Sequence, residues 1–199
     1  MFSNLRFEYK LWLLLFIVMS SVLCLQIFDR FSEHENLLES RHKEIQHLVE
    51  SAVSLTSSFY ERRGILGDEE AKKQAINAIK QLRYENGDGY FWINDYNAKI
   101  IMHPIKPALN GKDMSSFADP NGKRLFSEFV KTVRSSEKGI VDYFWSKPGK
   151  DQPVEKSSYV QGFKPWNFII GTGVYIDDID AAFWAKSRTS IFSLLLILV

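Results

Sequence analysis

Seven side chains in strand-like parts of the sequence have the chemistry needed to bind a small organic anion. They are Tyr90, Trp92, His103, Tyr143, Trp145, Lys156 and Tyr159. Successive residues of a strand point to opposite faces, so Tyr90 shares a face with Trp92, and Tyr143 shares one with Trp145. A small carboxylate needs one cation and two or three hydroxyl or N–H donors in a mostly apolar surrounding. Lys156 is the expected cation because it lies within a strand rather than in a turn.

Each of these residues also has a plainer interpretation when it is taken alone. Lys156 fits a solvated strand position equally well, and His103, beside Pro104 at a strand end, fits a structural histidine. The tyrosines taken singly fit packing residues, because their rings are large and apolar. Lys112 and Arg83 are expected to be ion-pair or loop residues. The prediction of a ligand pocket therefore depends on the seven residues as a group.

The sequence gives no positive sign of catalysis, of a metal site or of a cofactor. Its histidines are His34, His42, His47 and His103. They form no metalloprotease helix motif, and the first three are spaced by eight and five residues, which do not share one helix face well. The aspartates within residues 177–180 are explained by the dipole of a helix that starts there. Phosphate-binding glycine loops and nucleophile motifs are also missing. We therefore expect a protein that is not an enzyme, without catalytic residues, metal ligands or cofactor.

The charge balance argues against a nucleic-acid partner. The formal net charge is +1, with 25 basic and 24 acidic residues, whereas a nucleic-acid-binding domain is expected to be basic.

An apolar segment near the start of the chain predicts a membrane anchor. Residues 11–28 carry no charge over 18 positions, and as a helix they would be roughly 27 Å long, close to the ~30 Å hydrocarbon core of a bilayer. A cleaved signal peptide is the alternative, but its apolar region is normally only about 7–15 residues long. Arg6 and Lys10 precede the segment and acidic residues follow it, so the positive-inside rule places residues 1–10 in the cytoplasm. Residues 29–185 are then expected outside.

A second apolar segment closes the chain. Residues 191–199 would rise only about 13 Å as a helix, too little to cross a bilayer. We interpret residues 189–199 as the truncated start of a second membrane helix, although Lys186 and Arg188 before it are mildly against this orientation.

Residues 29–62 predict one long helix without proline or glycine. Its seam positions at alternating spacings of three and four are Phe31, His34, Leu38, Arg41, Ile45, Leu48, Ala52, Leu55 and Phe59. Such a seam is typical of a helix that packs lengthwise on a partner. The partner is either the same helix of a second subunit or the body of the domain.

The remaining sequence predicts a sheet core over residues 84–178. The expected elements are helices at 68–84 and 121–134, a hairpin at 89–104, and strands at 140–146, 154–163 and 166–176.

Several short phrases follow one another in a fixed order between Arg83 and Asp178. They are Arg83-Tyr84, Gly89–Ile93, Met102-His103-Pro104, Leu109–Asp113, Asp119–Gly122, Tyr143–Gly149, Lys156–Val160, Phe163–Trp166 and Gly171–Tyr175. In this order they resemble the single Cache family of bacterial extracytoplasmic sensors, in its second subtype. Ser146 departs from the family pattern, which often has proline at that position.

This resemblance implies an α+β fold, a PAS-like five-stranded antiparallel sheet with a long N-terminal helix, plus transmembrane helices. It also implies a sensor domain in the periplasm, anchored in the inner membrane of a bacterium, that binds a small carboxylate such as acetate, propionate or pyruvate. The expected protein is the sensor part of a methyl-accepting chemotaxis receptor, a homodimer whose cytoplasmic signalling module is missing from this chain.

Four alternatives stay open at this point. The same sensor can belong to a histidine kinase or a diguanylate cyclase. A domain that binds no ligand, with a structural or dimerising role through the seam, is the alternative of another class. An amine or amino-acid ligand would need a carboxylate in the pocket, for which Asp95, Asp113 and Asp142 are the near candidates.

Overall fold

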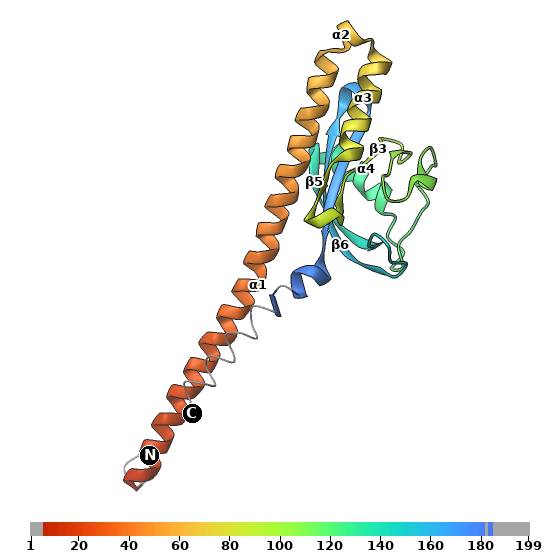
Figure 1. The fold of residues 1–199 in the computed structure, drawn as a ribbon. Coiled ribbons are helices and arrows are strands. Elements are labelled where there is room, and N and C mark those ends of the chain that lie inside the picture. Colours follow the sequence, from red (N-terminus) through yellow and green to blue (C-terminus); the bar gives the residue numbers. More distant parts are fainter. Residues whose placement is uncertain (1–5, 182, 185–199) are drawn as a thin grey trace. The chain divides into compact units, whose positions relative to one another are not determined.

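The computed structural model describes residues 6–181, 183 and 184, except for the side chains of residues 23 and 26–31 (Figure 1). Contacts between residues divide the chain into two units, Met1–Glu39 and Ser40–Val199. In the first unit the chain is helical from Phe7 onward, as part of helix α1, Phe7–Glu61. Large apolar side chains of this part are exposed, such as Trp12 and Phe16 at 68% and 71%.

Within the described part of the chain, no helix has both the length and the apolar content that a membrane crossing requires. The membrane helix expected at 11–28 stays a prediction. The second membrane segment, expected at 189–199, lies outside the described residues.

The second unit is built on a five-stranded antiparallel sheet with strand order β4-β3-β7-β6-β5. The strands are β3 (Trp92–Asp95), β4 (Ile100–Met102), β5 (Lys138–Ser146), β6 (Pro153–Phe163) and β7 (Phe168–Tyr175). A separate two-stranded pair, β1 (Arg83–Tyr84) and β2 (Gly89–Tyr90), leads into β3. The predicted α+β fold with a five-stranded antiparallel sheet is confirmed.

Helices cover both faces of the sheet. The amphipathic helix α4 (Leu125–Ser136) packs on one face and buries Phe129 and Val133 there. The opposite face meets α1, where the His42 Nε2 atom lies 2.8 Å from the Ser157 hydroxyl oxygen of β6. Two further helices, α2 (Arg63–Leu66) and α3 (Asp68–Gln81), connect α1 to β1.

The buried stripe of α1 differs from the predicted seam. Ile45, Val49, Ala52 and Thr56 are buried, so only Ile45 and Ala52 of the seam occupy the centre of the contact. Three other seam residues, Leu48, Leu55 and Phe59, are only half-buried. The difference arises because the domain body, a sheet rather than a second helix, sets which side of α1 is covered.

Helix α4 begins at Leu125, four residues later than the expected start at residue 121. Asp119 does not cap the helix. Its Oδ1 atom accepts hydrogen bonds from the backbone N–H groups of Asn121 and Lys123, at 3.0 and 2.9 Å, and so holds a separate turn. Its Oδ2 atom accepts from the N–H of Phe144 in β5, at 3.0 Å, which ties this turn to the sheet.

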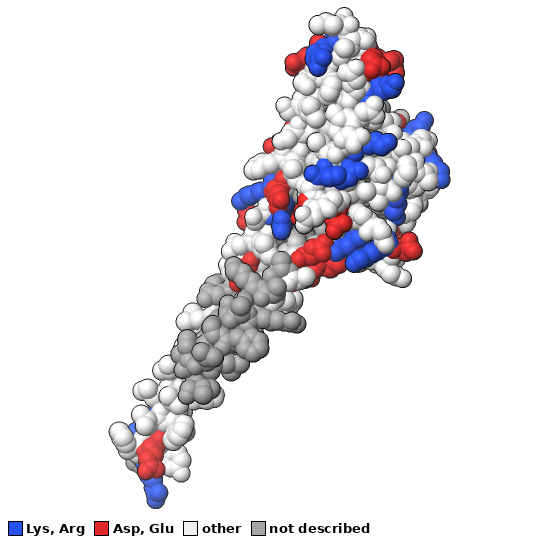
Figure 2. Space-filling model, viewed as in Figure 1, with Lys and Arg blue, Asp and Glu red and all other residues white. Residues whose placement is uncertain are grey.

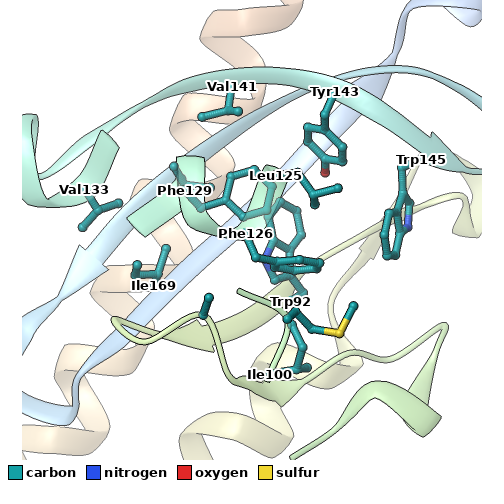
Figure 3. Packing of buried hydrophobic residues seen from close by; sticks show 13 residues of the cluster. Trp92, Ile100, Leu125, Phe126, Phe129, Val133, Val141, Tyr143, Trp145 and Ile169 are labelled. Atoms are coloured by element: carbon teal, nitrogen blue, oxygen red, sulfur yellow. The ribbon is translucent and has the colours of Figure 1, made fainter. Parts of the chain in front are cut away.

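Charges of both signs are interspersed over the described residues on the face shown in Figure 2. This mixed surface agrees with the formal net charge of +1. The apolar core lies between α4 and the sheet, where Phe129, Val133, Val141 and Ile169 pack together (Figure 3).

Candidate ligand-binding site

A cavity lies at one end of this core, between α4 and the sheet. Its lining residues are Tyr90, Trp92, His103, Leu125, Phe126, Phe129, Tyr143 and Trp145. The free space inside it is about 10 Å³, roughly what a single water molecule needs. Figure 3 shows the rings of Phe126, Phe129, Tyr143 and Trp145 turned toward this region from α4 and β5. The wall must therefore move apart before an organic ligand can enter.

The strand register brings the lining residues to one face of the sheet. Tyr143 of β5 lies opposite Lys156 of β6, which lies opposite Tyr175 of β7. Directly opposed residues of antiparallel strands share a face. Trp92 of β3 lies opposite Gly171, where an added Cβ would come within 2.4 Å of the indole ring. Glycine at this position therefore makes room for the Trp92 side chain.

Lys156 is a buried ammonium held by aromatic rings. The residue is 1% exposed, and its Nζ atom lies 4.3 Å from the ring centroid of Tyr90 and 4.5 Å from that of Tyr175. Nζ also donates a long hydrogen bond of 3.5 Å to the Tyr175 hydroxyl. None of the ion pairs among the described residues includes Lys156. Burial lowers the pKa of Lys156 to about 7, and Glu85 opposes this only in part.

Lys156 is not itself a lining residue of the cavity. Its ammonium packs against the ring of Tyr90, which does line the cavity, and lies 5.9 Å from the ring centroid of Trp92. The positive charge thus lies immediately behind the aromatic wall.

His103 is fixed as a neutral N–H donor. Its Nδ1 atom accepts a hydrogen bond from the backbone N–H of Lys106 at 3.0 Å, so in the neutral ring the proton resides on Nε2. The backbone N–H of His103 donates to Asn110 Oδ1 at 2.7 Å, which holds the residue at the end of β4. Burial, with smaller effects of Lys156 and Lys106, lowers the pKa of His103 to about 3.

The tyrosines of the cavity keep their protons. Burial raises the pKa of Tyr90 to about 12 and raises that of Tyr143 well above its ordinary value. The Tyr143 hydroxyl lies 2.9 Å from the Ser158 hydroxyl. The Trp92 indole N–H is already engaged, since it donates to Asn94 Oδ1 at 3.1 Å. The donors of this wall are the tyrosine hydroxyl groups, the His103 N–H and the Trp145 indole N–H, which interacts with the Tyr90 hydroxyl.

The structure brings together six of the seven predicted residues and separates Tyr159 from them. Five line the cavity and Lys156 lies behind it. Tyr159 lies opposite Ile140 and Thr172 on the face that meets α1, and Lys138 and Glu50 are the charged groups that act on it. The spacing of three between positions 156 and 159 in one strand already places them on opposite faces.

Four residues of the site were not predicted. Leu125, Phe126 and Phe129 of α4 complete the cavity wall, and Tyr175 contacts the ammonium of Lys156. The sequence showed the three α4 residues as an apolar helix face, but only packing decides which part of that face covers the cavity. Within the described residues, no group of three or more His, Cys, Asp or Glu side chains is arranged to hold a metal ion.

Known proteins similar to this chain are bacterial sensors. The methyl-accepting chemotaxis protein McpP of Pseudomonas putida KT2440 is 40% identical over 181 residues, which cover 90% of this chain and 33% of that protein. The sensor histidine kinase MctS of Rhizobium johnstonii is 33% identical over 147 residues, 74% of this chain and 31% of that protein. The chain thus spans about a third of the length of these relatives.

Solved structures agree with these relatives and identify the family. A structure described as a periplasmic sensor domain of a chemotaxis protein superposes with a TM-score of 0.68 at 44% identity, covering 70% of this chain and 97% of that chain. A second, from work on carboxylic acid recognition by a Cache chemosensory domain, has a TM-score of 0.68 at 42% identity, covering 72% and 98%. The family described as single Cache domain 2 matches residues 37–189, well over half of the sequence, and the chain therefore belongs to the single Cache family of sensor domains.

Proposed function

We propose that this chain is the periplasmic sensor region of an inner-membrane receptor and that it binds a small carboxylate in the cavity between α4 and the sheet. The observation that carries this proposal is the buried ammonium of Lys156, which has aromatic neighbours and no carboxylate partner among the described residues. An unpaired buried charge is costly. An anionic ligand would offset that cost, whereas a cationic ligand would add to it.

The surroundings suit a short carboxylate better than other anions. The His103 Nε2 proton and the hydroxyl groups of Tyr90 and Tyr143 provide donors, while Phe126 and Phe129 provide an apolar wall for a short carbon chain. The cavity as it stands, with about 10 Å³ of free space, must widen for any acid, and acetate, propionate or pyruvate would require less widening than larger metabolites. The relative whose structure concerns carboxylic acid recognition supports the same ligand class.

Ligand binding is proposed to act through Tyr175, the last residue of β7. Its hydroxyl accepts from Lys156 Nζ at 3.5 Å and donates to the carbonyl oxygen of Ser146 at 3.1 Å. The next residue, Lys147, forms ion pairs of 2.8 and 2.6 Å with the aspartates at 177–178, in the helical segment that follows β7. A carboxylate that draws the ammonium away from the Tyr175 ring would disturb this chain of contacts. Only a ligand with different affinities for the two arrangements can shift the balance between them.

The membrane placement and the output are part of the same proposal. The exposed apolar side chains of α1, such as Trp12 and Phe16, support a membrane helix within residues 11–28. A methyl-accepting chemotaxis receptor is the favoured whole protein because of the relative from P. putida, and a sensor histidine kinase is the alternative because of the relative from R. johnstonii. We propose no catalytic activity and no cofactor for this region, in keeping with the non-enzymatic signalling role of Cache sensor domains.

The test is calorimetric titration of the 199-residue chain in detergent with acetate, propionate, pyruvate and lactate. Saturable binding is expected for the unsubstituted chain, and Lys156→Met is expected to weaken it by about tenfold to a hundredfold, because a charge-assisted hydrogen bond contributes about 1.5–3 kcal/mol. Lys150→Met, the same change at an exposed position, should leave binding unchanged. Binding that survives Lys156→Met would remove this residue from the site, and no binding of any acid would refute the proposal.

A homodimer is proposed as well, on the half-buried α1 residues Leu48, Leu55 and Phe59, which the domain body leaves partly accessible. Sedimentation of the chain with and without ligand tests this. A constitutive dimer that binds none of the acids would favour the structural or dimerising role instead.

A further inference from the structure

A second lysine lies beside the cavity. Lys106 is half-buried, and its Nζ atom donates a 2.6 Å hydrogen bond to the Ser146 hydroxyl. The same atom lies 4.5 Å from the ring centroid of Trp145, a lining residue. None of the ion pairs in the described part of the chain includes Lys106.

The two lysines act on the same histidine. The ammonium groups of Lys156 and Lys106 both lower the pKa of His103, with burial the larger cause. The backbone N–H of Lys106 also binds His103 Nδ1, so its main chain is held against the cavity wall. His103 thus feels two positive charges, and the lining residues carry no carboxylate to offset them.

A ligand with a single carboxylate would balance only one of these charges. The long side chain of Lys106 is anchored at Ser146 by one hydrogen bond, so exchange of that bond for a ligand oxygen requires only rotation of the side chain. The Trp145 ring also attracts this ammonium, because 4.5 Å from the ring centroid lies within the ~6 Å range of a cation–π contact.

We propose that Lys106 is a specificity-determining residue that binds a second oxygen group of the ligand. The preferred ligand class is then a short carboxylic acid with a 2-oxo group, a 2-hydroxy group or a second carboxylate. This inference rests on the proposed function, since it assigns the first carboxylate to Lys156.

The experiment compares four three-carbon acids by calorimetric titration of the 199-residue chain in detergent. Propionate has no second oxygen group, lactate and pyruvate carry one at carbon 2, and malonate has a second carboxylate. The unsubstituted chain is expected to bind at least one of the latter three about tenfold or more tightly than propionate. Lys106→Met should remove this advantage and leave propionate affinity within about twofold, whereas Lys150→Met should preserve the advantage.

The outcomes separate the two proposals. No binding of any acid would refute the proposed function and this inference with it. Equal affinity for all four acids, or an equal loss for propionate and for the oxygen-rich acids in Lys106→Met, would overturn the role of Lys106 and leave the sensor function standing. Thermal unfolding of each variant checks folding. If the methionine variant does not fold, Lys106→Gln replaces it, because glutamine can still donate to Ser146 but carries no charge. This variant is expected to bind malonate no more tightly than propionate. A glutamine variant that still prefers malonate would overturn the inference.

Discussion

Replacing Lys156 with methionine should stabilise the ligand-free protein. Burial lowers the pKa of this lysine from 10.5 to about 7. At about 1.36 kcal/mol per pKa unit, the shift corresponds to roughly 5 kcal/mol of destabilisation. Contacts of the ammonium with the Tyr90 and Tyr175 rings offset about 2 kcal/mol of this. Methionine has a similar length and no charge, so a net gain of about 3 kcal/mol is expected at pH 7, on the order of 6–12 °C in the unfolding temperature.

The sign of the pH dependence gives a sharper test. The folded-state pKa of Lys156 lies below the unfolded value, so between pH 7 and about 10.5 the unfolded chain holds a proton that the folded chain lacks. The free energy of unfolding contributed by this group therefore rises with pH, and the penalty is fully present below pH 7. Between pH 7 and 9 the unsubstituted protein should gain roughly 2–3 kcal/mol from this source, and the methionine variant should gain none.

Thermal unfolding followed by circular dichroism at pH 7 and pH 9 measures both effects. The gap between the methionine variant and the unsubstituted chain should be wide at pH 7 and nearly closed at pH 9. Lys150→Met serves as the control, because its side chain is exposed and its substitution should shift neither curve. A methionine variant that unfolds at a lower temperature at pH 7, or a gap that does not narrow, would refute the argument that Lys156 is an uncompensated buried charge.

Two further predictions follow from the same geometry. Carboxylate affinity measured by calorimetry should fall about tenfold from pH 6 to pH 8, because Lys156, with a pKa of about 7, must be protonated to bind an anion. His103, with a pKa of about 3, stays neutral over this range. A carboxylate affinity that does not change with pH would contradict this prediction. Gly171→Ala should destabilise the fold by about 1–3 kcal/mol in thermal unfolding, because the added Cβ would come within 2.4 Å of the Trp92 ring. Gly64→Ala is the control and should be neutral or stabilising, because a Cβ at that position would have no atom within 4 Å. Similar effects of the two substitutions on stability would contradict the prediction.

The sequence by itself determined most of the elements and much of the cavity wall, but the helix expected at 68–84 ends at Gln81, and Arg83–Tyr84 form β1 instead. Alternating aromatic residues bounded by turn residues predicted the strands, and alternation alone placed Tyr90 with Trp92 and Tyr143 with Trp145. These four residues do line one cavity. The prediction succeeded because it used spacing within single strands, which the period of two fixes.

Only the tertiary structure decided which strand faces coincide and what covers them. The register of β5, β6 and β7 aligns Tyr143, Lys156 and Tyr175, and a shift by one residue would have turned Lys156 to the face that meets α1, where Tyr159 lies. Packing likewise decides that Phe129 of α4 lines the cavity. It also brings the backbone N–H of Lys106 to His103 Nδ1, which fixes the tautomer of the histidine. Contacts between segments distant in sequence depend on register and docking, which local spacing does not specify.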